Sequence, residues 1–139
     1  MYSLGFDIGS VSLNTVVLNE TDEILEEFYD YCHGKPFITL NNRLSEILKK
    51  YPEKDLKKLA FTGSGGKKAV SQLGGIFVNE IIAQSAAVTK YYPQAKTVIE
   101  MGGEDSKLLF MENGQLNGKS HLSDFSLNSL CAAGTGSFL

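Results

Sequence analysis

The 139-residue sequence is poor in cysteine, in net charge and in long apolar runs. Its two cysteines, Cys32 and Cys131, cannot form a disulfide framework, which favours a reducing, cytoplasmic setting. A net charge of −3 gives no electrostatic footprint for nucleic acid or for an anionic membrane. No apolar run is long enough to span a bilayer. The first residues do not resemble a signal peptide, because a basic segment is missing and Asp7 interrupts the apolar run.

Two common nucleotide-binding loops are also missing from the sequence. Neither G-x-x-x-x-G-K-[ST] nor G-x-G-x-x-G occurs, so a bound nucleotide would have to be held by β-turns. The histidines, His33 and His121, form no metal-ligand pattern with a cysteine or a carboxylate, so we do not expect zinc. What the chain does have is 14 glycines, many of them in short clusters. These clusters mark the places where the backbone could approach a ligand closely.

The hydrophobic pattern predicts an α/β fold that opens on a meander. Strands at 2–8, 12–19 and 24–32 are separated by short polar turns, which predicts three antiparallel strands. Helices and strands alternate after this meander, and the C-terminal residues are predicted to form a loop that leads into a helix. The later predicted elements are a helix from Pro36 to Pro52, a strand in 56–64, helices at 67–75 and 79–92, a strand at 95–101, a hairpin joined by Asn113-Gly114, and the tail at 123–139. We therefore expect a mixed sheet with flanking helices rather than a dinucleotide-binding fold that alternates from its first strand.

The stretch FDIGSVS is the first candidate for a phosphate-binding turn. Asp7 ends a predicted strand, Gly9 permits a tight turn, and the backbone amides and hydroxyls of Ser10, Val11 and Ser12 follow. Such a turn can cradle phosphate oxygens while the carboxylate of Asp7 holds a hydrated magnesium ion. A plain β-hairpin with a convenient glycine explains the same residues.

The stretch IEMGGEDSK repeats this arrangement. Glu100 lies near the end of a strand, Gly102 and Gly103 follow, and Glu104 and Asp105 come next. A polar hairpin turn is the alternative. Two turns of this kind suit two loops that grip one polyphosphate and its metal ion, with the carboxylates of Asp7 and Asp105 as the candidate catalytic groups. The stretch TGSGG (62–66) is either a third turn facing an anion or a plain strand-to-helix connection.

Cys131 stands in CAAGTG among small residues, which leaves its thiol sterically open. A metal or cluster ligand and a reactive thiol are both compatible with that setting, and so is a buried cysteine that acts as a small apolar residue. One cysteine cannot hold a [4Fe–4S] cluster, which needs four thiolates. We interpret Cys32 as a structural residue, since it has no partner at a ligand spacing.

Taken together, five stretches resemble the activators of 2-hydroxyacyl-CoA dehydratases and the ATPase subunits of benzoyl-CoA reductases. The similarity is closest to the large CoA-substrate-specific enzyme activases and covers essentially the whole chain. GGEDSK and CAAGTG are specific to this family, whereas DIGS is shared with the whole superfamily of actin, sugar kinases and Hsp70. The five stretches, in chain order, are LGFDIGSVSLNTVVL, FTGSGG, FVNEIIAQSAA, VIEMGGEDSKLL and LNSLCAAGTGSFL.

The resemblance implies a ribonuclease H-like fold with two similar α/β domains and Mg-ATP in the cleft between them. It also implies a homodimer or a tandem pseudo-dimer that shares one [4Fe–4S] cluster. ATP hydrolysis would then drive a low-potential electron into a dehydratase or a benzoyl-CoA reductase-like partner. Residues 1–139 would form a single N-terminal subdomain of such a module, with the second half of the module absent.

The functional positions implied by the resemblance can be assigned one at a time. The first phosphate loop comprises Asp7, Gly9, Ser10, Val11 and Ser12, the second comprises Gly102, Gly103 and Glu104, Cys131 is a cluster ligand, and Gly134, Thr135 and Gly136 form the segment between the two halves. Two positions depart from the family pattern. Asn14 stands where many members have a lysine, which removes a positive charge near the phosphates, and Glu100 stands where the superfamily has an aspartate. A sugar- or acid-kinase-like enzyme and a non-catalytic interaction domain therefore remain open alternatives.

Overall fold

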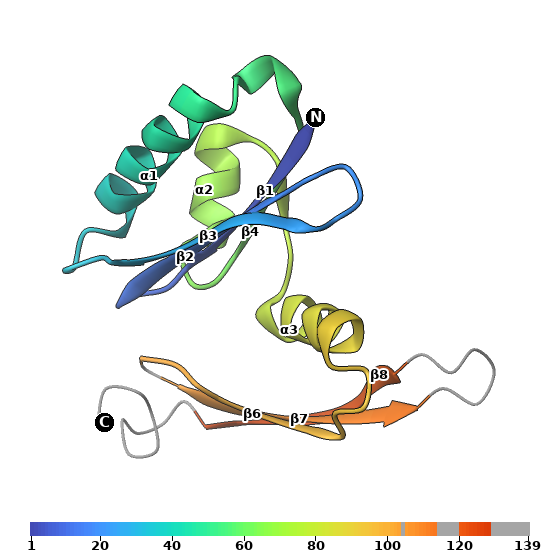
Figure 1. Cartoon of the computed structure of the whole chain (residues 1–139). Coiled ribbons are helices and arrows are strands. Elements are labelled where there is room, and N and C mark those ends of the chain that lie inside the picture. Colours follow the sequence, from blue (N-terminus) through green and yellow to red (C-terminus); the bar gives the residue numbers. More distant parts are fainter. Residues whose placement is uncertain (104, 114–119, 129–139) are drawn as a thin grey trace. The chain divides into compact units, whose positions relative to one another are not determined.

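The computed structural model describes residues 1–103, 105–113 and 120–128 (Figure 1). By its internal contacts the chain divides into two compact units, residues 1–79 and 80–139. No shift in composition predicted this division. Each unit contains three consecutive antiparallel strands, so a meander occurs twice along the chain.

The first unit is built on a five-stranded mixed sheet in the order β3-β2-β1-β4-β5. β1 (Tyr2–Ile8), β2 (Ser12–Leu18) and β3 (Ile24–Tyr31) are antiparallel neighbours, as the short turns between them predicted. β4 (Leu56–Thr62) pairs in parallel with β1, and the short β5 (Ile76–Phe77) pairs in parallel with β4. The predicted fold class, with an antiparallel opening and parallel strands reached through helices, is confirmed.

One face of this sheet is covered by two helices. α1 (Pro36–Lys50) begins with a proline at a position where no backbone donor is needed, and a 3₁₀ turn, η1 (Glu53–Asp55), follows it. α2 (Gly66–Leu73) ends at Gly74, whose positive φ suits glycine. Both helices contribute to the core together with alternate residues of the strands. The core residues are Tyr2, Leu4, Phe6, Ile8, Leu13, Val17, Cys32, Leu40, Ile47, Phe61 and Ala69.

The alternation along β1 separates the core face of the sheet from the face that carries polar groups. Phe6 and Ile8 are almost fully buried, and Phe6 stacks on Phe61 of β4 at 5.5 Å between ring centroids. Ser3, Gly5 and Asp7 are less buried and lie on the opposite face. Asp7 therefore projects from the face of the sheet that α1 and α2 do not cover.

The second unit combines one helix with a three-stranded antiparallel sheet. α3 (Glu80–Tyr91) precedes β6 (Thr97–Met101), β7 (Ser106–Asn113) and β8 (Ser120–Asn128), which pair in the order β6-β7-β8. The helix lies against this sheet, and the hydroxyl of Thr89 donates a hydrogen bond to the carbonyl of Ser120 at 3.1 Å (Figure 1).

Two predictions for the second unit are wrong. A two-residue turn at Asn113-Gly114 was expected, but Asn113 is the last residue of β7 and pairs with Ser120 of β8. The start of the tail, from Ser123 to Asn128, was expected to be a loop and instead belongs to β8. Aspartate and asparagine are depleted in strands, so the pairing with β7 decides the structure of this segment. In the described part of the chain, no helix is long and apolar enough to cross a membrane.

Candidate functional site

The first candidate loop closes the hairpin between β1 and β2. The Gly9 N–H donates to the carbonyl of Ser12 at 3.0 Å, and Ser10 and Val11 at the tip are exposed. No acceptor among the described residues pairs with the amides of Ser10 and Val11. Exposed amides in a tight turn can donate hydrogen bonds to an anion without breaking any contact of the fold.

Polar side chains flank Asp7 on both neighbouring strands. Asn14 of β2 is its direct partner across the antiparallel pair, and Thr62 of β4 is its partner across the parallel pair. The hydroxyl oxygen of Thr62 is buried and has no hydrogen-bond partner among the described residues. A buried hydroxyl without a partner is costly unless something else satisfies it, so a site next to Asp7 fits water or a hydrated cation.

The TGSGG segment packs against the last residues of β1. The Gly65 N–H and the Ser64 hydroxyl both donate to the Ile8 carbonyl, at 2.9 and 3.3 Å, and the Gly66 N–H donates to Gly63 at 3.0 Å. A Cβ added at Gly63 would lie 2.5 Å from an Asp7 carboxylate oxygen. Two of its amides are thus used within the fold, which favours a strand-to-helix connection that supports the first loop over a third anion-facing turn.

The second candidate loop, between β6 and β7, has the same local geometry as the first. The Gly102 N–H donates to the Asp105 carbonyl at 2.8 Å, as Gly9 does to Ser12. Glu100 pairs with Lys107 across the strands, as Asp7 pairs with Asn14. Each loop thus lies between the first two strands of a three-stranded meander, with an acid two residues before the glycine.

Lys107 is the last residue of the GGEDSK stretch, but the sequence interpretation assigned it no role. Its side chain is only 5% exposed, and its ammonium nitrogen lies 2.8 Å from Glu100, 3.0 Å from Asp105 and 3.7 Å from Glu80. Glu80, the first residue of α3, was not predicted either. Alternation along β7 was the available signal, because it places Lys107 on the same face as the buried Leu109 and Met111.

Opposing effects act on the pKa of Lys107. Burial works to lower it, but the hydrogen bonds to Glu100 and Asp105 and the attraction of Glu100 and Glu80 outweigh the burial. The pKa therefore lies well above the ordinary lysine value, and the side chain is charged at all physiological pH values. The second loop thus contains a permanent buried cation, and the first loop has Asn14 in the same place.

Some of the other residues singled out in the sequence lie within the described residues, and the rest lie outside them. Gly103 lies in the second loop beside Gly102. Cys32 lies in the core of the first unit, where burial raises the pKa of its thiol, in keeping with a structural role. The remaining candidates, Glu104, Cys131, Gly134, Thr135 and Gly136, fall outside the described residues.

The order of the elements and the two matching loops identify the fold class of this protein. Solved structures with the same fold include a Ppx/GppA phosphatase of Aquifex aeolicus, with a TM-score of 0.54 at 13% identity over 94% of this chain and 52% of that one. The predicted ribonuclease H-like fold is confirmed. Within this class, residues 4–139 match the BadF/BadG/BcrA/BcrD ATPase family, and the chain belongs to it.

Characterised relatives agree with this assignment. The 2-hydroxyisocaproyl-CoA dehydratase activator of Clostridioides difficile is 31% identical over 100% of this chain and 50% of its own length. Component A of (R)-2-hydroxyglutaryl-CoA dehydratase from Acidaminococcus fermentans has a TM-score of 0.84 at 27% identity, over 99% of this chain and 51% of that one. The Clostridium difficile activator with bound ADPNP has a TM-score of 0.79 at 28% identity, over 99% and 49%. The chain thus spans about half the length of these relatives.

Proposed function

We propose that residues 1–139 are the N-terminal part of the ATPase module of an activator of a CoA-substrate enzyme, and that each of the two loops takes part in binding Mg-ATP. The observation that carries the proposal is the matched geometry of the two hairpins, each closed by a glycine amide and each preceded by an acid. Membership of an ATPase family supports the choice of ATP. A relative with bound ADPNP supports it as well.

Each loop residue has a proposed task. The carboxylate of Asp7 would hold a water-coordinated magnesium ion beside the unsatisfied hydroxyl of Thr62. The amides of Ser10 and Val11 would donate to phosphate oxygens, with Gly9 and Ser12 holding the turn closed. On the second loop, Gly102, Gly103 and Glu104 would approach the phosphates, with Asp105 as the second catalytic acid.

The partner proposed for this module is a 2-hydroxyacyl-CoA dehydratase or a benzoyl-CoA reductase-like enzyme. Relatives that activate dehydratases support this choice. A [4Fe–4S] cluster, shared within a homodimer or a tandem pseudo-dimer, would supply the low-potential electron. Cys131 would provide one of its thiolates, and Gly134, Thr135 and Gly136 would connect the two halves of the module. We place the protein in the cytoplasm.

Replacing Asp7 tests the nucleotide site in the full-length protein that this proposal implies. Asp7→Asn removes the charge that holds the magnesium ion, so we expect Mg-ATP to bind about tenfold more weakly or worse, measured by titration calorimetry. Glu27→Gln is the matched control, because Glu27 is an exposed carboxylate on the same face of the sheet but on β3. Equal affinities for Asp7→Asn and Glu27→Gln would reject the site.

The cluster and the class of reaction need separate measurements on the same protein. Cys131→Ser should abolish the visible absorbance of the cluster, and an unchanged spectrum would remove Cys131 from its ligands. Phosphoryl transfer from ATP to a sugar or a small acid would favour a kinase-like enzyme. No binding heat and no thermal shift with Mg-ATP would favour a non-catalytic domain.

A further inference from the structure

The second loop contains one buried cation surrounded by three acids. The Lys107 ammonium donates hydrogen bonds to Glu100 at 2.8 Å and to Asp105 at 3.1 Å, and Glu80 lies 3.7 Å away. Glu100 belongs to β6, Asp105 closes the loop, and Glu80 begins α3. One side chain thus joins both ends of the loop to the helix that packs on the same sheet.

The two loops share their hairpin geometry but differ in the charge of the residue that faces the acid. In both, the glycine amide donates to the carbonyl of the third residue after it, and the acid faces the residue two positions beyond that carbonyl. The facing residue is Asn14 in the first loop and Lys107 in the second. The geometry of the hairpin therefore does not require a lysine at this position. The positive charge of Lys107 acts instead on the carboxylates that surround it.

We propose that Lys107 is a positioning residue of the second phosphate loop, which fixes the carboxylates of Glu100 and Asp105 and offsets their charge toward a bound polyphosphate. This inference rests on the proposed binding of ATP by the two loops. An ammonium group offers three donors in free rotation, and two of them here are directed to the two carboxylates of the loop.

The charge balance of the cluster explains why a polyphosphate would need this lysine. Three carboxylates and one ammonium leave a net charge of −2 in a partly buried place, and loss of the ammonium would leave −3. Like charges in a low-dielectric site repel strongly, so phosphate oxygens would be repelled and the carboxylates would move apart. Asp105 carries the carbonyl that closes the loop, so its displacement would also open the turn.

The test separates phosphate binding from general damage to the fold. In the full-length protein, Lys107→Met and Lys107→Gln should weaken binding of ATP by about tenfold or more, while adenosine, which has no phosphates, should bind as before. Lys107→Arg, which keeps the charge and the donors, should recover most of the ATP affinity. Lys58→Met, at an exposed lysine of β4, is the control and should change neither ligand.

Other outcomes would overturn the inference. If ATP and adenosine weaken together, Lys107 merely supports the fold. If neither ligand weakens while the unmodified protein binds ATP, the role of Lys107 is rejected and the proposed function stands.

Discussion

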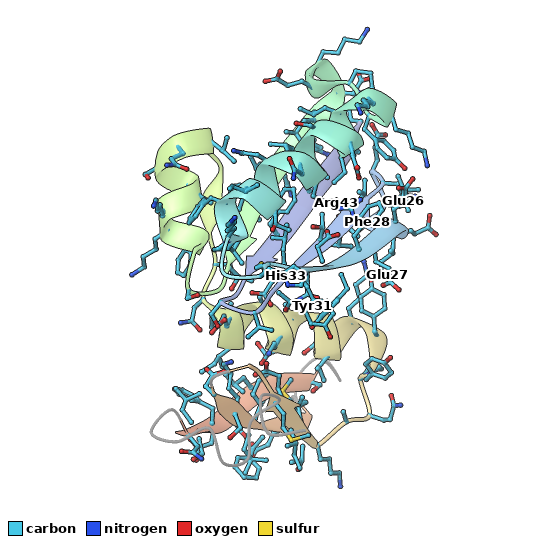
Figure 2. The ribbon with its side chains drawn as sticks, turned by 90° about the vertical axis from the view of Figure 1, so that its left-hand side faces the viewer. Glu26, Glu27, Phe28, Tyr31, His33 and Arg43 are labelled. Atoms are coloured by element: carbon cyan, nitrogen blue, oxygen red, sulfur yellow. The ribbon has the colours of Figure 1, made fainter. Side chains whose placement is uncertain are left out.

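At the scale of single residues, Arg43 ties the first helix to the edge of the sheet. Its guanidinium donates to both carboxylate oxygens of Asp30 on β3, at 2.8 and 2.6 Å, and lies 4.2 Å above the ring of Phe28 (Figure 2). Both charged side chains are mostly buried, at 19% and 23% exposure. A two-point charged contact of this kind is stronger than a surface pair because its geometry is fixed and water is largely excluded.

The pair makes the stability of the fold depend on pH in a defined direction. Hydrogen bonds from Arg43 lower the pKa of Asp30, although burial works against them. Since the folded pKa lies below the unfolded one, the pair stabilises the fold above about pH 4 and the stabilisation is lost as pH falls through the lowered pKa. We expect Asp30→Asn to reduce the free energy of unfolding by about 1–2 kcal/mol at pH 7.

Urea unfolding at pH 7 and at about pH 2.5 checks this expectation, since the difference between the unmodified protein and Asp30→Asn should shrink at the acid pH. Glu46→Gln is the control. Glu46 also contacts Arg43, but its side chain is 61% exposed, so its loss should matter little. A difference that stays the same at both pH values would contradict the assignment.

At the scale of elements, periodicity and turn residues were enough to predict most of the fold. The three opening strands, α1 between its prolines, α2 and α3 were all predicted close to their observed bounds. β5 was not predicted, because two residues are too short for a pattern. The extension of β8 through Ser123–Asn128 depends on pairing with β7, and the contact between Glu80 and Lys107 joins elements far apart in the chain. Such long-range partners cannot be read from local propensity.

The support of the first loop by the TGSGG segment gives a prediction at the same scale. Gly63 has φ +83°, and an added Cβ would lie 2.5 Å from the Asp7 carboxylate and 2.6 Å from the Ile8 carbonyl. Gly63→Ala should therefore displace the end of β1, which the sheet holds in place, and lower the free energy of unfolding by about 2–4 kcal/mol. It should also weaken Mg-ATP binding if the first loop holds the nucleotide.

Gly74→Ala is a matched control for this substitution. Its φ of +76° imposes the same conformational cost, but an added Cβ meets nothing within 4 Å. We expect it to lose about 1 kcal/mol and to keep its ligand affinity. Urea unfolding measures the difference between the two alanine variants. Equal losses would show that the contact with Asp7 is not tight.

At the scale of the whole molecule, the chain contains two meanders whose first hairpins match in hydrogen bonding and register. The repeat of an acid, a spacer and a glycine in the sequence indicated that the two hairpins are similar. Their side chains differ, however, both at the acids and at the facing residues Asn14 and Lys107. The similarity of the two hairpins therefore lies in their backbone hydrogen bonds and strand register, which the sequence alone does not show. The two hairpins thus share one backbone arrangement, which supports a similar proposed task for each of them.

The length of the relatives leads to a prediction about ligand affinity. The chain spans about half the length of each related activator, so under the proposed function the rest of the module would supply further contacts to ATP, including those to the adenosine. Each contact that is lost lowers the net affinity, because the entropic cost of association stays the same. We therefore expect the 139-residue chain to bind Mg-ATP at least about a hundredfold more weakly than the full-length protein, where each factor of ten is about 1.4 kcal/mol.

Titration calorimetry on both proteins under the same conditions measures this ratio. Inorganic triphosphate is the informative second ligand, because it presents the phosphates without the nucleoside. Under the proposed function, the short chain should bind triphosphate and ATP with similar affinity, because its loops would contact only the phosphates, whereas the full-length protein should strongly prefer ATP. Sub-micromolar binding of ATP by the 139-residue chain would refute the prediction and would mean that these residues form a complete nucleotide site.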